Sequence, residues 1–240
     1  MKHLDIMFHC GVGFYPLVFK GSNMKFGIFI YDGVEPIDLA TFGVLSMARR
    51  IRPEIEICTV APLAGAVALS NGLTVLADFG VADARTLDVL IVTGGPGWVQ
   101  QARDPATLAF IQRLAGDTLL ASVCTGGMIL AASGVLDDKL ATTKREVVAP
   151  EFPPIDTMRK SYSKIDVREG VFIDNGQVIT GGGVSLCIDT TLYLLEKLFD
   201  AETASETARI MEYTTARQAN LREFPPILLE VTNDRRDQRQ

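Results

Sequence analysis

The sequence predicts an α/β protein with a single doubly wound, mostly parallel sheet that carries helices on both faces. Two observations lead to this class. Segments such as 87–95 and 118–124 are near-continuous apolar runs, which is typical of strands that are buried on both faces. Segments with apolar residues at helical spacing alternate with these runs, as at 105–115 and 185–199, and this alternation is the pattern of βα units.

Turn signals and periodicity define the expected elements in chain order. The run KFGIFIYDG at 25–33 ends in Asp-Gly, so we expect a buried strand and a turn there, and a helix after Pro36. Asn-Gly at 71–72 and at 175–176 stands between β-rich runs in each case, which is the strongest short hairpin signal. The other expected elements are strands at 55–62, 87–95, 118–124 and 139–143, hairpins over 67–79 and 171–183, and helices at 105–115, directly after residue 124, at 185–199 and at 201–214.

We expect one domain over residues 24–215, because no internal repeat or low-complexity linker interrupts it. Residues 1–23 are expected to be an N-terminal extension, since Met24 stands directly before the first strand. Alternatively, they form an arm that packs on the domain or on a partner. Residues 216–240 contain two consecutive prolines and end in a charged segment, so we expect a frayed C-terminal tail.

The composition narrows the functional class. The chain has 240 residues, of which 48% are hydrophobic and 22% charged, and this argues against a disordered protein. The formal charge of -6 disfavours a surface for nucleic acid or for an anionic membrane. No apolar run approaches the roughly 18–20 residues of a membrane-spanning helix. We therefore expect neither a nucleic acid nor a membrane as the partner of this protein.

Cysteine and histidine usage argues against a metal centre. The four cysteines are far apart and contain no CxxC spacing, which fits neither a disulfide framework nor a zinc ribbon. Both histidines lie near the N-terminus, where His3, His9 and Cys10 are more simply explained without a metal than as ligands. We therefore expect no metal centre, and the cysteine spacing favours a reducing compartment, the cytoplasm.

Cys124 is the strongest candidate for a reactive group. It stands between a buried strand and an expected helix, and Gly126 and Gly127 follow it closely. A nucleophile on a sharp strand-to-helix turn needs small neighbours, and the helix amides would favour a thiolate. The alternative is a buried cysteine that only packs, as we expect for Cys58 and Cys187.

Asp38 is the candidate acid, and it also has two interpretations. It could cap the helix that follows Pro36. Alternatively, it is a buried carboxyl group near the thiol that transfers protons, which its apolar flanks Ile37 and Leu39 favour. Glu35 is the competing carboxylate.

The third candidate feature is the Gly-Gly-Pro-Gly segment after the strand at 87–95. Gly94, Gly95 and Gly97 could form only a turn, or their amides could bind an anion or a developing negative charge. The segment is not a dinucleotide-binding fingerprint, and no P-loop motif occurs in the chain.

Three segments together resemble the ThiJ/PfpI superfamily, whose fold is similar to that of class I glutamine amidotransferases. They are LDVLIVTGGPG, ASVCTGGMILAASGVLDDKLATT and VITGGGVSLCIDTTLYLLEKLF. The pattern looks most like the isonitrile hydratase branch and the related N-terminal domains of AraC-type regulators. The resemblance implies a cysteine nucleophile elbow, with Cys124 as nucleophile, Asp38 as acid and Thr125 beside the developing charge. It also implies a homodimer.

Two positions depart from the family pattern. Lys144 stands where relatives usually have a histidine, and Cys187 stands where they often have a small residue. Lysine is a much weaker base than histidine unless it is desolvated, so we expect Lys144 to line the pocket rather than act as a base. The leading hypothesis is a cofactor-free enzyme that uses a cysteine thiolate on a small-molecule substrate. The resemblance implies that the reaction is hydration of an isonitrile to an N-substituted formamide. The alternatives are a small-molecule sensor domain and a stress-type activity on reactive carbonyls.

Overall fold

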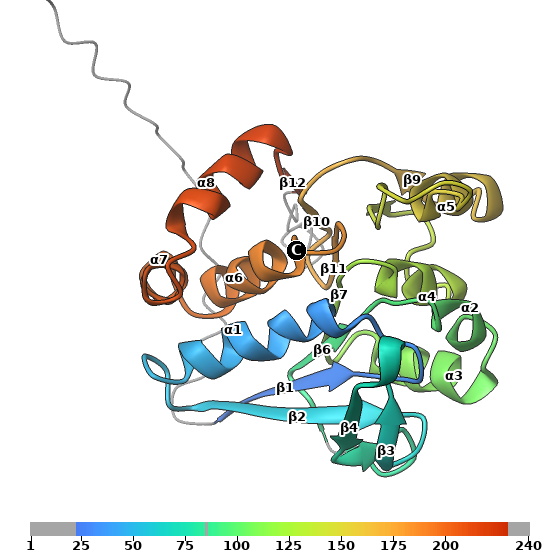
Figure 1. Ribbon diagram of the computed structural model, residues 1–240, viewed down its shortest axis with the longest axis horizontal. Helices are drawn as coiled ribbons and strands as arrows, with labels where there is room; N and C mark the ends of the chain where they lie inside the picture. The colour runs from blue at the N-terminus through green and yellow to red at the C-terminus, as the bar shows by residue number, and fades with distance from the viewer. Residues whose placement is uncertain (1–22, 85, 230–240) are drawn as a thin grey trace, which may run out of the picture.

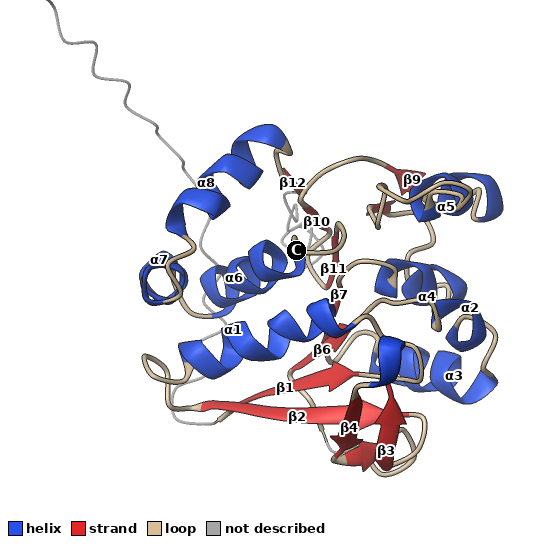
Figure 2. Ribbon diagram, in the orientation of Figure 1, coloured by secondary structure: helices blue, strands red, loops and turns tan. Residues whose placement is uncertain are grey.

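A central sheet of eight strands organises the chain in the computed structural model, which describes residues 23–84 and 86–229 (Figure 2). All neighbouring strands in it run parallel except β10 and β11, which form the expected hairpin. In spatial order the strands are β12 (Ile227–Leu228), β10 (Phe172–Asp174), β11 (Val178–Gly181), β7 (Leu119–Ser122), β6 (Val89–Val92), β1 (Met24–Phe29), β2 (Ile55–Ala61) and β5 (Phe79–Gly80).

Helices cover both sides of this sheet, which confirms the predicted α/β class (Figure 1). One layer contains α1 (Ala40–Ala48), α6 (Cys187–Leu198), α7 (Ala201–Ile210) and α8 (Thr214–Glu223). The other contains α2 (Trp98–Gln101), α3 (Pro105–Leu114), α4 (Gly126–Ala132) and α5 (Pro154–Ser161). A 3-10 helix, η1 (Pro36–Leu39), leads into α1.

Two small strand pairs lie outside the main sheet. The hairpin expected around residues 71–72 is present, with β3 (Gly65–Ala68) antiparallel to β4 (Thr74–Ala77) and the 3-10 turn η2 (Ser70–Gly72) between them. The short strand β8 (Leu140–Ala141) pairs in parallel with β9 (Asp166–Val167).

The middle of the sheet forms the core. Every residue of β6 and β7 is buried, and so is every residue of β1 except Lys25. These are the strands that the sequence shows as near-continuous apolar runs. Because both faces are covered by helices, no face of these strands needs polar residues.

The expected C-terminal tail from residue 216 needs correction. Residues 216–223 continue α8, and β12 adds an edge strand to β10. The polar composition of α8, none of whose residues is buried, hides it from a search for apolar periodicity. Residues 230–240 and the proposed N-terminal extension, apart from Asn23, lie outside the described residues. Among residues 23–84 and 86–229, no group of three or more acidic, cysteine or histidine side chains is placed to hold a metal.

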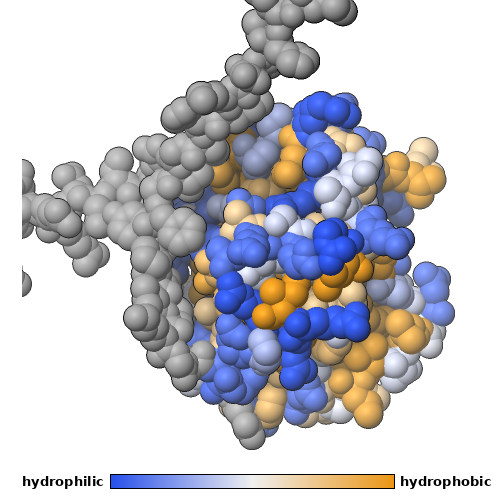
Figure 3. Space-filling view, turned by 90° about the vertical axis from the view of Figure 1, so that its left-hand side faces the viewer, coloured by the Kyte–Doolittle hydropathy of each residue, from blue (hydrophilic) through white to orange (hydrophobic). Residues whose placement is uncertain are grey.

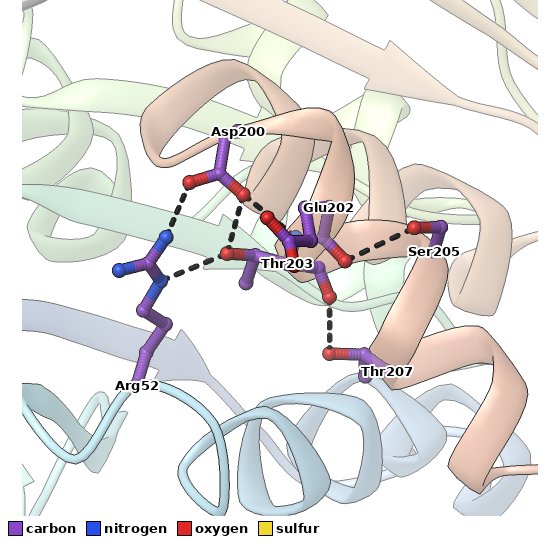
Figure 4. A network of polar contacts seen from close by, with 6 residues as sticks. All are labelled: Arg52, Asp200, Glu202, Thr203, Ser205 and Thr207. Atoms are coloured by element: carbon purple, nitrogen blue, oxygen red, sulfur yellow. Dashed lines mark hydrogen bonds and ion pairs between the residues drawn. The ribbon is translucent and has the colours of Figure 1, made fainter.

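A polar network joins Arg52, which lies in the turn after α1, to the start of α7 (Figure 4). Asp200 caps α7, because its Oδ1 accepts hydrogen bonds from the amide and the hydroxyl of Thr203, both at 2.7 Å. Arg52 forms an ion pair with the other oxygen of Asp200 and donates to Thr203 Oγ1 at 2.8 Å. The network therefore holds the layer of α1 and α7 together.

The surface carries both hydrophobic and hydrophilic residues. On the face shown in Figure 3, hydrophobic residues form separate patches among hydrophilic ones. Among the described residues, none of the helices combines the length and the apolar character that crossing a bilayer requires.

We predict that Asp200→Ala lowers the free energy of unfolding by about 1–2 kcal/mol, because the first turn of α7 loses its cap and Arg52 loses its partner. Urea denaturation measures the change. Glu202→Ala removes an exposed acidic side chain from the same turn and is the matched control. Equal stability of the two variants would contradict a capping role for Asp200.

Candidate functional site

Three chain segments meet at the carboxyl ends of neighbouring strands in the central sheet. Strands β1, β6 and β7 are neighbours and run parallel, so the segments that follow their carboxyl ends lie together. Asp38 follows β1, Gly94 follows β6 and Cys124 follows β7. Ligands bind outside these carboxyl ends in open parallel sheets.

The predicted strand-to-helix turn at Cys124 is present between β7 and α4. Cys124 has a φ of 51°, in the left-handed region that non-glycine residues rarely adopt. Its amide donates to the Gly182 carbonyl at 3.0 Å, and its own carbonyl accepts from Thr143 Oγ1 at 2.7 Å. Both backbone groups are thus held, and this maintains the strained conformation. A Cβ at Gly126 would lie 2.0 Å from the Val92 carbonyl oxygen, so only glycine fits there.

The Cys124 thiol is protonated more firmly than the sequence suggests. The residue is 2% exposed, and burial together with the charge of Asp38 raises the pKa of the thiol well above its usual value. The Thr125 amide and the charge of Lys144 oppose this shift but are outweighed. The Thr125 amide does favour the thiolate, as expected for the helix amides, but desolvation is the larger effect in this conformation.

Asp38 is buried beside the thiol and does not cap a helix. Its Oδ2 accepts a hydrogen bond from the Gly94 amide at 2.6 Å, and its carboxyl group also interacts with the Cys124 side chain. Burial, helped by the charge of Glu35, raises the pKa of Asp38 to about 7 against the opposing effects of Gly94, Cys124 and Lys144. A carboxyl group with this pKa exchanges protons readily at neutral pH. Glu35 is only half-buried, so Asp38 is the better candidate acid.

The glycine amides after β6 are already engaged. The Gly95 amide donates to Thr125 Oγ1 at 2.8 Å, and the Gly97 amide donates to the Gly33 carbonyl at 3.3 Å. With the Gly94 amide on Asp38, none of the three is available for the anion pocket that the sequence suggested. They instead hold Asp38 and Thr125 in position. The amide that acts on the sulfur is that of Thr125.

Lys144 lies at the side of the site. Its charge lowers the pKa of both Asp38 and Cys124, and its Nζ donates to the carbonyl of Glu146. A Cβ at Gly183 would lie 2.8 Å from the Cβ of Lys144, so the glycine lets the lysine pack closely. Lys144 therefore supplies positive charge near Asp38 and Cys124.

Tyr31 is a site residue that sequence analysis missed. Its side chain is fully buried, and its hydroxyl donates to the Thr93 carbonyl at 3.0 Å. Burial and the charges of Asp38 and Cys124 raise its pKa, while a hydrogen bond with the Thr125 side chain lowers it. The only signal in the sequence is a tyrosine at the end of the first strand, where an aromatic residue normally contributes to the core.

Cys187 is a second buried thiol beside Asp38. It begins α6, and its Sγ donates to the Ile37 carbonyl at 3.7 Å. Burial and the charge of Asp38 raise the pKa of Cys187 to about 12. The Asp38 carboxyl group therefore interacts with two thiols, of which Cys124 alone lies on the strand-to-helix turn.

Comparison with known proteins identifies one family for this chain. The model of the DJ-1/PfpI family matches residues 24–197. An isonitrile hydratase of Pseudomonas putida is 30% identical over 195 residues, which cover 80% of each chain. A helix-turn-helix transcriptional regulator of Pseudomonas aeruginosa is 28% identical over 60% of this chain, but the match spans only 41% of the regulator.

Solved structures agree on the fold. A ThiJ/PfpI family protein of Pseudomonas syringae superposes with a TM-score of 0.69 at 24% identity, covering 85% of this chain and 88% of that one. An AraC family transcriptional regulator of Pseudomonas putida gives a TM-score of 0.65 at 17% identity, covering 78% of this chain and 99% of that one.

We predict that alkylation of Cys124 by iodoacetamide follows a titration with a midpoint near pH 7. The thiol can lose its proton to ionised Asp38, so the rate should follow the ionisation of that carboxyl group. Peptide mass spectrometry resolves Cys124 from the more exposed Cys58, which is the internal reference. In Asp38→Asn the midpoint near pH 7 should disappear; an unchanged profile would contradict the coupling.

We predict that Tyr31→Phe increases the alkylation rate of Cys124 at pH 7 several-fold. The Thr125 hydroxyl is shared among Tyr31, the Gly95 carbonyl at 3.3 Å and Cys124, whose pKa it already lowers. Without the Tyr31 hydroxyl it has two acceptors instead of three, so its interaction with the sulfur should strengthen. Tyr162→Phe is a control at a tyrosine outside the site. The increase should vanish in a Tyr31→Phe, Thr125→Val double variant; a slower single variant would refute this role.

We predict that ionisation of Asp38 destabilises the fold as pH rises. The pKa of Asp38 is about 7 in the folded protein against an ordinary value of 3.8 for an aspartate, so between these limits the folded state binds more protons. The free energy of unfolding should then fall as pH rises through this window, by up to about 1.4 kcal/mol per pH unit from this group. Urea unfolding from pH 4 to 8 should show this slope, and Asp38→Asn should lack it.

Proposed function

Since this chain belongs to the DJ-1/PfpI family, we propose that it is a cofactor-free enzyme that uses Cys124 to hydrate an isonitrile to an N-substituted formamide. The observation that carries the proposal is the contact between the Cys124 thiol and a buried carboxyl group with a pKa of about 7. Such a pair can pass one proton in either direction at neutral pH. The similarity to the Pseudomonas putida isonitrile hydratase supports the choice of substrate.

The first half of the reaction forms a bond between sulfur and carbon. The thiol proton of Cys124 moves to ionised Asp38, and the sulfur attacks the terminal carbon of R–N≡C. Asp38 then gives the proton to that carbon, which yields the thioimidate R–N=CH–S–Cys124. Negative charge that develops during the attack lies beside the Thr125 amide and the positive charge of Lys144.

The second half adds water. Asp38 takes a proton from a water molecule whose oxygen bonds to the thioimidate carbon, and it passes that proton to the nitrogen. The C–S bond then breaks as Asp38 takes the hydroxyl proton and gives it to the sulfur. The products are R–NH–CHO and the free thiol, so the net change is the addition of one water molecule.

The burial of the thiol fits this substrate class. With 2% of Cys124 exposed, only a narrow group can approach the sulfur without a rearrangement. The terminal carbon of an isonitrile carries no substituent, and the group is linear. A peptide carbonyl is far bulkier at the carbon that is attacked.

A second candidate function is a small-molecule sensor. The regulators among the relatives favour it, because an AraC family protein shares the fold over 78% of this chain. A thiol with a raised pKa is also compatible with binding without turnover. A stress-type activity, in which Cys124 attacks an aldehyde, is the weaker alternative.

We predict that the purified protein converts isonitriles to formamides, measured by NMR or gas chromatography on a small panel that also contains 2-oxoaldehydes. Cys124→Ala and Asp38→Asn should each abolish turnover, because one removes the nucleophile and the other the proton carrier. Lys144→Ala should retain turnover and change mainly the substrate preference.

Two results would overturn the proposal. Binding of panel compounds without turnover would favour the sensor. Turnover that is lost in Lys144→Ala but retained in Asp38→Asn would exclude the mechanism given above.

A further inference from the structure

A hollow of about 190 Å³ lies apart from the reacting pair, between α2 and α5 and over α4. These helices lie together on the right of Figure 1. Cys124 does not line the hollow, and the proposed reaction makes no use of it. Its lining residues are Trp98, Val99, Ala102, Arg103, Met128, Thr157, Ser161 and Tyr162.

The lining combines an apolar body with one cation. Trp98, Val99, Met128 and Tyr162 offer two aromatic rings and two aliphatic side chains. The charge of Arg103 acts on Tyr162 strongly enough to oppose the rise in its pKa. In residues 23–84 and 86–229, no carboxylate forms an ion pair with Arg103.

The neighbouring carboxylate is committed elsewhere. Asp104 follows Arg103 in sequence, but it caps α3 through Oδ2, which accepts from the Thr107 amide at 2.9 Å and from the Thr107 hydroxyl at 2.6 Å. The guanidinium of Arg103 is therefore available to a ligand. A guanidinium prefers a carboxylate or phosphate partner.

Each wall of the hollow is tied to a residue of the Cys124 site. The Trp98 amide donates to the Gly95 carbonyl at 3.0 Å, and the Met128 amide donates to the Thr125 carbonyl at 3.0 Å. The amide of Ile155, in the first turn of α5, donates to the Lys144 carbonyl at 3.0 Å. A ligand between these helices would therefore contact the segments that position the residues around Cys124.

We propose that this hollow is a second binding site, for a small organic carboxylate with an apolar or aromatic body. The volume corresponds to about six water molecules, so the ligand is small. The carboxylate pairs with Arg103, and the body packs between Trp98 and Tyr162 above Met128. The existence of this second site does not depend on the reaction proposed for Cys124.

Trp98 allows a direct test, because it is the only tryptophan of the chain. Benzoate should change the intrinsic tryptophan fluorescence of the full-length protein in a saturable way, and neutral benzamide should bind at least about tenfold more weakly. Arg103→Gln should weaken benzoate binding by about tenfold, the equivalent of about 1.4 kcal/mol. Arg49→Gln, which removes an arginine at the end of α1, should leave it unchanged.

Isothermal titration with Cys124→Ala separates this site from the proposed reaction. Benzoate should bind this variant as it binds the unaltered protein, even if neither protein hydrates an isonitrile. No saturable signal, equal binding of benzamide, or unchanged binding in Arg103→Gln would overturn the second site. Loss of benzoate binding in Cys124→Ala would place the carboxylate at the reactive thiol instead.

Discussion

The hydrogen bond from the Gly94 amide to the Asp38 carboxyl group connects the two halves of the site. It brings the turn after β6 to the η1 segment after β1. Gly94 also lies directly under the Cys124 turn, since a Cβ on it would come within 2.4 Å of the Thr125 amide nitrogen. Any side chain at position 94 would therefore push apart the acid, the thiol and Thr125. The close approach of three backbone segments is what brings a carboxyl group to the sulfur.

Burial determines the chemistry of this pair more than charge does. Desolvation is the largest cause of the raised pKa of both Asp38 and Cys124. Two groups that each resist ionisation, and whose anions repel one another, share a single negative charge more readily than they carry two. Lys144 and the Thr125 amide partly compensate for that charge. With a pKa of about 7, the Asp38 carboxyl group is the member of the pair that ionises first near neutral pH.

The central features of the fold could be predicted from the sequence because they depend on local signals. Buried parallel strands favour apolar runs, hairpins favour Asn-Gly turns, and the Cys124 turn needs Gly126 against the Val92 carbonyl. The position of Asp38 after the first strand was enough to make it a candidate. The C-terminal elements gave no such signal, because α8 buries none of its residues and β12 has only two.

Features that depend on long-range contacts could not be predicted. Whether an amide is free depends on which distant acceptor reaches it, and the Gly95 amide is taken by Thr125, 30 positions away. The role of Tyr31 likewise depends on neighbours from three other segments. The net effect on the pKa of Cys124 required knowing how deeply the thiol is buried. Helix amides act over one turn, whereas desolvation depends on the whole packed environment.

The oxygen atoms of Asp38 bear on the choice between a chemical and a purely structural role for this residue. Oδ2 is satisfied by Gly94, but Oδ1 is buried without a partner of regular hydrogen-bond geometry. Leaving a buried polar atom unsatisfied costs about 1–3 kcal/mol, and a scaffold that only packs has no reason to retain it. A site that passes protons needs such an oxygen, because an acceptor already committed to a fixed donor cannot take one from a thiol or a water molecule. The carboxyl group of Asp38 therefore fits a catalytic role better than a purely structural one.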